Sequence, residues 1–378
     1  MDIPQALPRI PANHSMLDCA LLHPSLRQPS IKVQFNTHRS RVQDVQLQIP
    51  RPRSDRWIGG TIQELLTHVH QTSQGDVSAH QLGFVEAFEQ LYDISDKVPE
   101  NVIASRSLVV EWERVWEHGK WFVELTSHAG LEYIANRLKK TLNLFNRAIQ
   151  QAVGTTIPQL GTLFEVGTSQ FKLTVNNIDA LKKANLETQH RLKNIRQELL
   201  FNPRFRSFFA QVGVLDTRSA TYTGAVGVVA RSSGIGGDLR ITDPYWSYID
   251  NPIRPTISHD QDLWGIVRVR LAEMAESLRF SLALLEAAEP IEGGGEKDDS
   301  FDVGSLDGEQ EGRMVVRLEN SRGPTLYNLS CARGGEVTAA TILHPCVTNL
   351  ASLAHRLRGV PTRHIGRIIH AYNLTSPT

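Results

Sequence analysis

The sequence predicts an α+β protein with a mainly helical core, a small N-terminal antiparallel β region, and a C-terminal hairpin with further helices. Between about residue 61 and residue 288, six segments repeat apolar residues at the three-to-four-residue spacing of a helix face. Two short runs before residue 50 alternate apolar and polar residues, as half-buried strands do. A glycine-rich acidic stretch then separates the helical region from a second pair of strand-like runs.

The composition is that of an ordinary globular protein. The chain has 378 residues, 40% of them hydrophobic, with 40 Lys plus Arg against 40 Asp plus Glu, so no net field attracts nucleic acid. No apolar run approaches the ~20 residues that span a bilayer, and the N-terminus lacks the pattern of a signal peptide. Cys19, Cys331 and Cys346 form no C-x-x-C pair and suggest no disulfide framework, which favours a reduced, cytoplasmic setting.

The elements follow from periodicity. The alternating runs over 31–35 and 45–49 are expected to pair as antiparallel strands. Helices are expected from about residue 61, around 84–92 after an entry at 78–80, and over 102–121, 132–152, 176–200 and 260–288. In the helix over 132–152, the apolar residues that support the prediction are Ile134, Leu138, Leu142, Leu144 and Phe145.

Composition shifts divide the chain into an N-terminal β region (1–57), a helical core (58–290), an acidic Gly-rich linker (291–312) and a C-terminal part (313–378). The linker holds eight acids against a single lysine. It is either a disordered spacer or a partner-binding segment. The C-terminal part is expected to form a hairpin, with strands over 314–318 and 325–329 around a turn at 321–324. Two short helices over 346–358 and 362–372 follow and pack on the core.

The stretch over 222–240, closed by Asp243-Pro244-Tyr245, is a glycine-rich turn with one acid, Asp238, between two arginines, Arg231 and Arg240. In a structural interpretation, Asp238 pairs with an arginine and fixes a tight loop, while the glycines at 234, 236 and 237 supply unusual backbone angles. A phosphate-binding loop would need a helix after it, and the sequence from Ile241 to Pro244 does not continue as one.

Taken with four further segments, this stretch resembles one family, that of the 49-kDa subunit of respiratory complex I and the large subunits of membrane-bound nickel–iron hydrogenases. The stretch is similar to the family's "TGP…ARASG…D-x-R…PY" block. The other matching segments, in the family's order, are 99–118, 263–279, Glu319 with Arg322-Gly323, and 344–359. The resemblance covers roughly residues 60–372 and implies a hydrogenase large-subunit-like fold. Five weak motifs in one order support one another.

The resemblance also shows departures at the metal ligands. Hydrogenases hold nickel and iron with two cysteine pairs, since soft thiolates suit that centre. Aligned on the helix around 84–89, Ser73 and Asp76 stand at the first pair's cysteine positions and His80 at the histidine that follows. The second pair would follow the last helix, where 370–378 contains no cysteine. The chain is therefore expected to bind no metal.

The complex I branch implies a quinone headgroup site made by a histidine in an N-terminal "HP" loop and a tyrosine near the lost cysteines. His23-Pro24 matches the loop, but the tyrosine position falls on Gln74. His23 is alternatively a surface-loop histidine.

The resemblance implies an oxidoreductase-family subunit, peripheral to a membrane on its cytoplasmic face. It would dock on an iron–sulfur small subunit through Arg231, Asp238 and Arg240, whose charges would face the partner's cluster and raise its potential. The iron–sulfur cluster would belong to the partner, no cofactor is expected on this chain, and a quinone acceptor stays open at a cavity of His23, Ser73, Gln74, Asp76 and His80. The alternative is a catalytically inactive scaffold or assembly subunit that keeps the fold.

Overall fold

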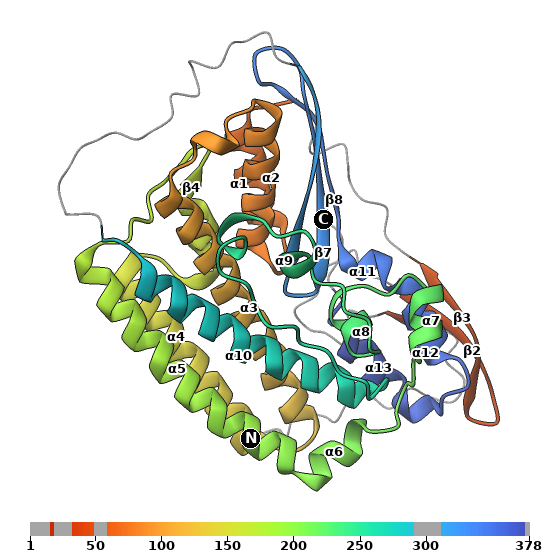
Figure 1. Ribbon diagram of the computed structural model, residues 1–378. Coiled ribbons are helices and arrows are strands. Elements are labelled where there is room, and N and C mark those ends of the chain that lie inside the picture. Colours follow the sequence, from red (N-terminus) through yellow and green to blue (C-terminus); the bar gives the residue numbers. More distant parts are fainter. Residues whose placement is uncertain (1–15, 19–31, 49–58, 291–310, 375–378) are drawn as a thin grey trace.

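A computed structural model describes residues 16–18, 32–48, 59–290 and 311–374. His23, Cys19 and nearly all of the predicted linker lie outside these residues. Within them, the architecture is the predicted one: a mainly helical core with small antiparallel sheets at both ends of the sequence (Figure 1). None of the described helices combines the length and the apolarity needed to cross a membrane.

Four long helices form the main layer. They are α3 (Glu100–His128), α4 (Glu132–Val153), α5 (Val175–Phe201) and α10 (Leu263–Ala287). Each of the four contacts two of the others, with α3 against α4 and α10, and α5 against α4 and α10 (Figure 1). Local chemistry sets their ends: Thr174 and Asn177 make a capping box at the start of α5, and Asp262 caps α10.

The predicted helices are confirmed, and in α4 one of the apolar residues named for the prediction is not buried. Its buried residues are Ile134, Leu138, Leu142, Phe145 and Ile149, among others. Leu144 is 38% exposed. At 100° per residue, a position two residues beyond Leu142 points away from the face that Leu142 buries.

Two shorter helices, α1 (Ile62–Thr72) and α2 (Val77–Leu91), pack against each other, and α2 lies against the C-terminal sheet. A capping box of Thr61 and Glu64 starts α1. The connections from α2 to α3 and from α4 to α5 contain η3 (Ser95–Lys97), η4 (Ile157–Leu163), β4 (Phe164–Glu165) and β5 (Thr168–Ser169).

The N-terminal sheet has the order β1-β2-β3 and is antiparallel, formed by β1 (Met16–Asp18), β2 (Lys32–His38) and β3 (Arg41–Gln48). The predicted pair is confirmed, with Phe35 opposite Val45 and both buried. The strand β1 was not expected, because three residues are too few to show alternation.

The C-terminal sheet is a meander of β6 (Gly312–Asn320), β7 (Gly323–Cys331) and β8 (Val337–Leu343). The predicted hairpin is confirmed, and its turn is tighter than expected because Asn320 already pairs with Gly323. The predicted helix over 346–358 is divided into α11 (Pro345–Thr348) and α12 (Leu350–Leu357). It is followed by η7 (Thr362–His364) and α13 (Ile365–Tyr372).

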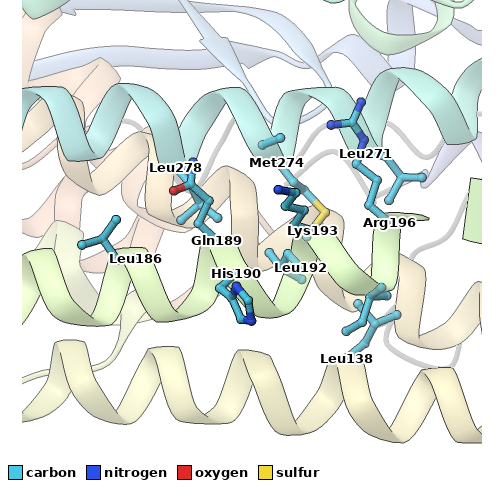
Figure 2. Close-up of a pocket in the computed structure, with 12 residues that line it drawn as sticks. Leu138, Leu186, Gln189, His190, Leu192, Lys193, Arg196, Leu271, Met274 and Leu278 are labelled. Carbon is cyan, nitrogen blue, oxygen red and sulfur yellow. The ribbon is translucent and has the colours of Figure 1, made fainter. Parts of the chain in front are cut away.

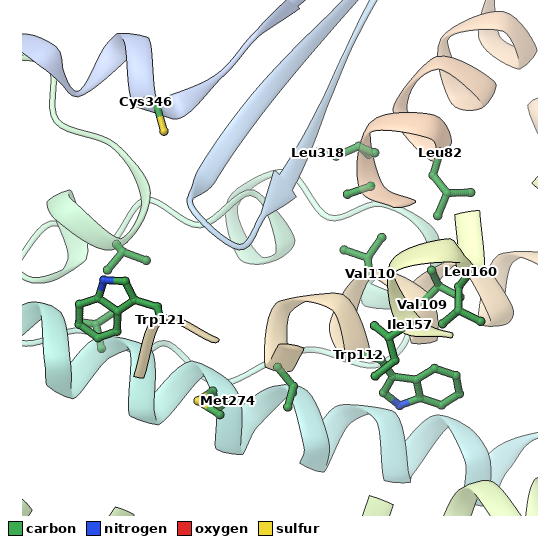
Figure 3. Close-up of a cluster of buried hydrophobic side chains, with 14 of the residues drawn as sticks. Leu82, Val109, Val110, Trp112, Trp121, Ile157, Leu160, Met274, Leu318 and Cys346 are labelled. Atoms are coloured by element: carbon green, nitrogen blue, oxygen red, sulfur yellow. The ribbon is translucent and has the colours of Figure 1, made fainter. Parts of the chain in front are cut away.

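Between α5 and α10 the chain runs through short helices: α6 (Pro203–Phe209), α7 (Thr217–Tyr222), α8 (Gly227–Arg231), α9 (Leu239–Thr242) and η5 (Trp246–Tyr248). The glycine-rich loop joins α8 to α9. A hydrophobic cluster joins the helical layer to α2, η4 and the C-terminal sheet, with Trp112 and Trp121 of α3 buried in it (Figure 3). The loop is therefore held between the main helical layer and the C-terminal sheet.

Candidate functional site

A buried ionic network surrounds Arg231 at the end of α8. Arg231 donates from Nε to Glu273 of α10 at 2.9 Å and from Nη1 to Glu319 of β6 at 2.8 Å. The same Nη1 bonds the Gly237 carbonyl at 3.0 Å. Only 1% of Arg231 is exposed. One side chain thus ties together a helix, a strand and the glycine-rich loop.

Arg240 forms the second centre of the network. Its guanidinium makes two hydrogen bonds to Asp238, at 3.0 and 2.7 Å, and bonds Glu111 of α3 at 2.9 Å. The Tyr248 hydroxyl donates to the same Glu111 carboxylate at 2.6 Å. Asp238 also accepts from the Arg240 backbone N–H, which caps the short helix α9.

The charges in the network compensate one another. Burial opposes ionisation of Glu273 and Glu111, but nearby arginines hold the pKa of both carboxyls below the usual range. Arg240 and Arg231 outweigh burial at Asp238 and lower its pKa to about 2. Burial and the charge of Asp238 raise the pKa of Glu319 to about 7.

This geometry confirms the structural interpretation of the loop, in which Asp238 pairs with an arginine. Arg231, Asp238 and Arg240 point into the chain and bond its own groups, so their side chains do not form an outer surface. Of the three loop glycines, only Gly234 has a positive φ, +84°. The exposed part of the loop is the backbone at Gly236 and Gly237.

A neutral histidine of α3, His118, extends the network along α10 to Arg270. Burial and Arg270 lower the pKa of His118 to about 4, so its ring is uncharged near neutral pH. Its Nε2 then donates to Glu273 at 2.8 Å, and its Nδ1 accepts from Arg270 at 2.9 Å. Arg270 also lies over the Trp121 ring, 4.7 Å from its centre.

The predicted cavity residue Asp76 is the centre of a second buried cluster. It is 1% exposed, and its Oδ2 lies 2.5 Å from Nη1 of Arg322, in the turn between β6 and β7. Its Oδ1 accepts from the Ser321 backbone N–H at 3.3 Å. Burial opposes ionisation, but Arg322, His344 and His80 hold the pKa of Asp76 well below the usual value.

Because Asp76 faces Arg322, it does not cap its own helix. Glu113 of α3 caps α2 instead, accepting from the backbone N–H groups of Ser78 and Ala79 at 2.9 Å each. Burial and the nearby charge of Asp76 raise the pKa of Glu113 to about 8.

Two histidines in this cluster differ in charge. Burial and His344 lower the pKa of His80 to about 3, and its Nδ1 lies 2.9 Å from the Tyr327 hydroxyl. Burial also opposes protonation of His344, but Cys346 and Asp76 raise its pKa to about 9. At neutral pH the cluster therefore holds a protonated His344 beside an uncharged His80.

The remaining predicted cavity residues are only partly placed together. Ser73 follows α1 and is half-buried, as is the adjacent Gln74. His23 lies outside the described residues. The structure thus brings Asp76 and His80 into one cluster and leaves the predicted partnership with His23 untested.

The donor set at these positions does not fit a nickel–iron centre. Ser73 offers a hydroxyl, and the carboxylate of Asp76 is engaged by a guanidinium, where the family's metal needs thiolates. Within the described ranges, no group of three or more His, Cys, Asp or Glu side chains is arranged to hold a metal ion. The absence of a metal cofactor on this chain stays a prediction.

A groove of about 520 Å³ lies elsewhere, between α4, α5 and α10 (Figure 2). Its floor is apolar, with Leu138, Leu192 and Met274, and basic side chains line it from α5. None of the predicted site residues lines this groove.

Sequence reasoning missed the roles of Arg322, His344 and Glu113. All three were quoted only as members of matching motifs. A charged residue in a tight turn is normally solvated, so Arg322 carried no local indication of burial. Its partner Asp76 is 246 residues away, and only the fold reveals the pair.

Comparison with known proteins gives three kinds of match. Residues 147–298 match the family model "Respiratory-chain NADH dehydrogenase, 49 Kd subunit". An NADH-quinone oxidoreductase subunit of Chloroflexus aurantiacus is 25% identical over 206 residues, which are 53% of this chain and 48% of that protein. The corresponding protein of Symbiobacterium thermophilum is 28% identical over 211 residues, 53% of this chain and 50% of that protein.

The matches to curated relatives thus span about half the length of each protein. The fold match is more extensive. A chain in the structure of the membrane-bound sulfane sulfur reductase, an archaeal respiratory membrane complex, superposes with a TM-score of 0.81 at 16% identity. The superposition covers 100% of this chain and 99% of that one. The sequence matches thus show a similarity to the 49-kDa subunit of respiratory-chain NADH dehydrogenase, and the superposition shows a fold shared with a subunit of a respiratory membrane complex.

Proposed function

We propose that this chain is a peripheral subunit of a membrane-associated, complex I-like oxidoreductase complex and that it docks on an iron–sulfur subunit. Its matched relatives are subunits of NADH-quinone oxidoreductases, and its structural neighbour belongs to a membrane-bound respiratory complex. The cluster belongs to the partner, and this chain contributes no nickel–iron centre of its own.

The docking surface we assign is the loop face, defined as Gly236 and Gly237 with the exposed side chains of Ile241 and Ile257. Ile257 is 41% exposed and Ile241 40%. The segment of Ile257 lies beside the loop, since a Cβ on Gly236 would be 3.0 Å from the Ile257 Cδ1. Two exposed isoleucines beside bare backbone permit close approach of another subunit.

The observation that carries this proposal is the buried network beneath the loop face. Arg231 holds the Gly237 carbonyl, and the Leu239 N–H bonds Glu319 at 3.3 Å. The Ser258 N–H bonds the Arg231 carbonyl at 2.9 Å, which fixes the neighbouring segment. A loop ordered in advance loses little conformational freedom on binding. The arginines therefore support docking from inside the chain.

The electron acceptor is left open. A quinone or another acceptor would have to reach the region of Asp76 and His80. The second candidate function is a scaffold subunit without redox chemistry, and the engagement of Asp76 by Arg322 favours it. In that case the ion pair stabilises the fold where a hydrogenase would hold its metal.

The test of docking is co-expression of this chain with its iron–sulfur subunit, followed by affinity capture. Ile257→Glu should lower the recovered complex at least roughly 10-fold, because it places a charge in an apolar contact. Tyr133→Glu on α4, where Tyr133 is 69% exposed, is the matched control and should have no effect. Equal recovery of both variants would refute the loop face. Arg231→Ala is unsuitable here because it leaves Glu273 and Glu319 buried without their cation.

Elemental analysis of the captured complex tests the chemistry. Iron without nickel supports a cluster in the partner subunit. Stoichiometric nickel would overturn the argument that this chain holds no metal centre. A stable complex with neither metal would favour the scaffold.

A further inference from the structure

The β2–β3 hairpin and the C-terminal helices meet in a strongly basic surface. We call it the hairpin patch: the exposed side chains of Arg39 and Arg41 on the hairpin, and of His355, Arg358 and Arg363 after it in the chain. Figure 1 shows β2 and β3 beside α12.

Backbone contacts hold the two segments together. The Val42 N–H bonds the Val360 carbonyl at 3.0 Å, and the Gly359 N–H bonds the Val42 carbonyl at 2.8 Å. At the hairpin tip, the Thr362 N–H bonds the Ser40 carbonyl at 3.0 Å. Because these residues are neighbours of Arg39, Arg358 and Arg363, the fold places arginines from distant parts of the sequence on one surface.

Few carboxylates offset these charges. In the two segments, 32–48 and 344–374, Asp44 is the sole acidic residue. It lies 3.7 Å from Arg358, and both side chains are more than half exposed, so the pair is weak. The whole chain is neutral, with 40 Lys plus Arg against 40 Asp plus Glu, so the excess of arginine is confined to part of its surface. The pKa of the half-buried His364 is lowered by burial and by Arg367 and Arg363, as expected in a positive local field.

The two described segments that form the patch expose no large apolar side chain of the kind found at the centre of a stable protein interface. Among the described residues, the large apolar side chains that are strongly exposed all lie outside 32–48 and 344–374. Protein interfaces place aromatic and aliphatic side chains at their centres and charges at the rim. Arginines without such a centre fit a planar array of phosphates better than a folded partner.

We propose that the hairpin patch is the surface with which this chain contacts the membrane, by binding the phosphate groups of anionic lipids. The proposal rests on the proposed function, because only a subunit that sits beside a membrane meets lipid headgroups. The new element is the orientation of the subunit, because the hairpin patch defines the side that faces the bilayer. The hairpin tip and the turn after α12 lie at the lipid surface, and the loop face is left for the iron–sulfur partner.

The experiment is flotation of the full chain with phosphatidylcholine vesicles that contain or lack phosphatidylglycerol. The wild-type chain should float only with the anionic vesicles, and salt should release it, because screening shortens the range of the attraction. Each arginine near an anionic surface is worth roughly fivefold in binding. Arg39→Glu with Arg363→Glu should therefore reduce the partition at least roughly 20-fold, and the two glutamine substitutions should give a smaller loss.

The matched control is Arg147→Glu with Lys183→Glu, two exposed residues on α4 and α5 that change the net charge equally. It should keep vesicle binding close to that of the wild type. Circular dichroism should show the same fold for all variants, since the substituted side chains are exposed.

Three results would overturn the proposal: no flotation of the wild-type chain, undiminished flotation of the hairpin variant, or an equal loss in the control. If the hairpin variant still floats but no longer assembles with other subunits, the patch contacts an acidic protein and the lipid assignment is wrong. Capture of the iron–sulfur subunit is measured separately. A failure of the loop face is therefore distinguishable from a failure of the hairpin patch.

Discussion

Asp76→Asn removes the anion at the centre of the second buried cluster and keeps the shape of the side chain. In the wild type, the Asp76 carboxylate lies 2.5 Å from Arg322 and 3.9 Å from His344, both of them 5% exposed. The variant leaves these cations without that partner. The Glu117 carboxylate, 3.3 Å from Arg322, compensates only in part.

Breaking a buried ion pair by removing one partner lowers the free energy of unfolding by about 3–5 kcal/mol. We expect the lower end, about 3 kcal/mol, for two reasons. The amide oxygen of asparagine still accepts hydrogen bonds, and without the Asp76 charge Glu113 ionises at a lower pH and supplies a nearby anion.

The pH dependence should change as well. The pKa of His344 is raised from 6.5 to about 9 in the folded protein. The folded state therefore binds more protons than the unfolded state between these values, and this contribution to stability is lost as the pH rises from 6.5 through 9. One pKa unit corresponds to about 1.4 kcal/mol, so this contribution is about 3 kcal/mol. In the variant, the pKa of His344 should fall and the slope over this window should flatten.

The assay is urea-induced unfolding at pH 6.5 and pH 9, with linear extrapolation to water. The control is Asp243→Asn, which breaks the ion pair with Arg317 at 2.6 Å on the surface, where the side chains are 59% and 54% exposed. It should change stability by less than about 1 kcal/mol. A loss for Asp76→Asn that stays within roughly 1 kcal/mol of this control would refute the reasoning.

Two further predictions test the packing around this cluster. Glu113→Gln should flatten the decline in stability with rising pH. The pKa of Glu113 is raised from 4.5 to about 8 in the folded protein, so its contribution to stability is lost as the pH rises across that window. Urea unfolding at pH 5 and pH 8 measures the decline, and an unchanged slope in the variant would contradict the prediction. Gly227→Ala should destabilise by more than about 3 kcal/mol, because φ is +58° and the new Cβ would lie 2.1 Å from the Arg322 carbonyl oxygen. The control is Gly224→Ala, where φ is +64° and no atom lies within 4 Å of the new Cβ, and it should cost only about 1 kcal/mol. Equal melting temperatures of the two alanine variants would show that the contact between residue 227 and the Arg322 carbonyl does not matter.

Local patterns were sufficient to predict most elements. The helix face of Ile62, Leu65, Leu66 and Val69 is buried as its spacing indicated. The strand β8 was missed because its buried residues, Val337 and Ala340, do not alternate with exposed ones. It is held by pairing with β7 along its length, and a single strand's sequence does not show its neighbour.

The sequence identified several residues of the candidate site, but it did not show how their side chains pair in space. Arg231, Asp238 and Arg240 were singled out as a charge cluster, and the structure shows the expected pairing of Asp238 with an arginine. That this cluster faces a partner's redox centre stays a prediction. The sequence contains no information on which side of the loop Glu273 and Glu319 lie. Asp76 and His80 were chosen from the position of the family's metal ligands, and the structure shows that an arginine now occupies that region.

The sequence by itself determined the long helices, the strands β2, β3, β6 and β7, the glycine-rich loop and the family resemblance, because these depend on residues close together in the chain. The tertiary structure alone decided that the loop's arginines face inward, that Asp76 meets Arg322, and that the hairpin arginines join those after α12. The physical reason is that burial and charge pairing depend on distance in space, and a sequence records only order along the chain.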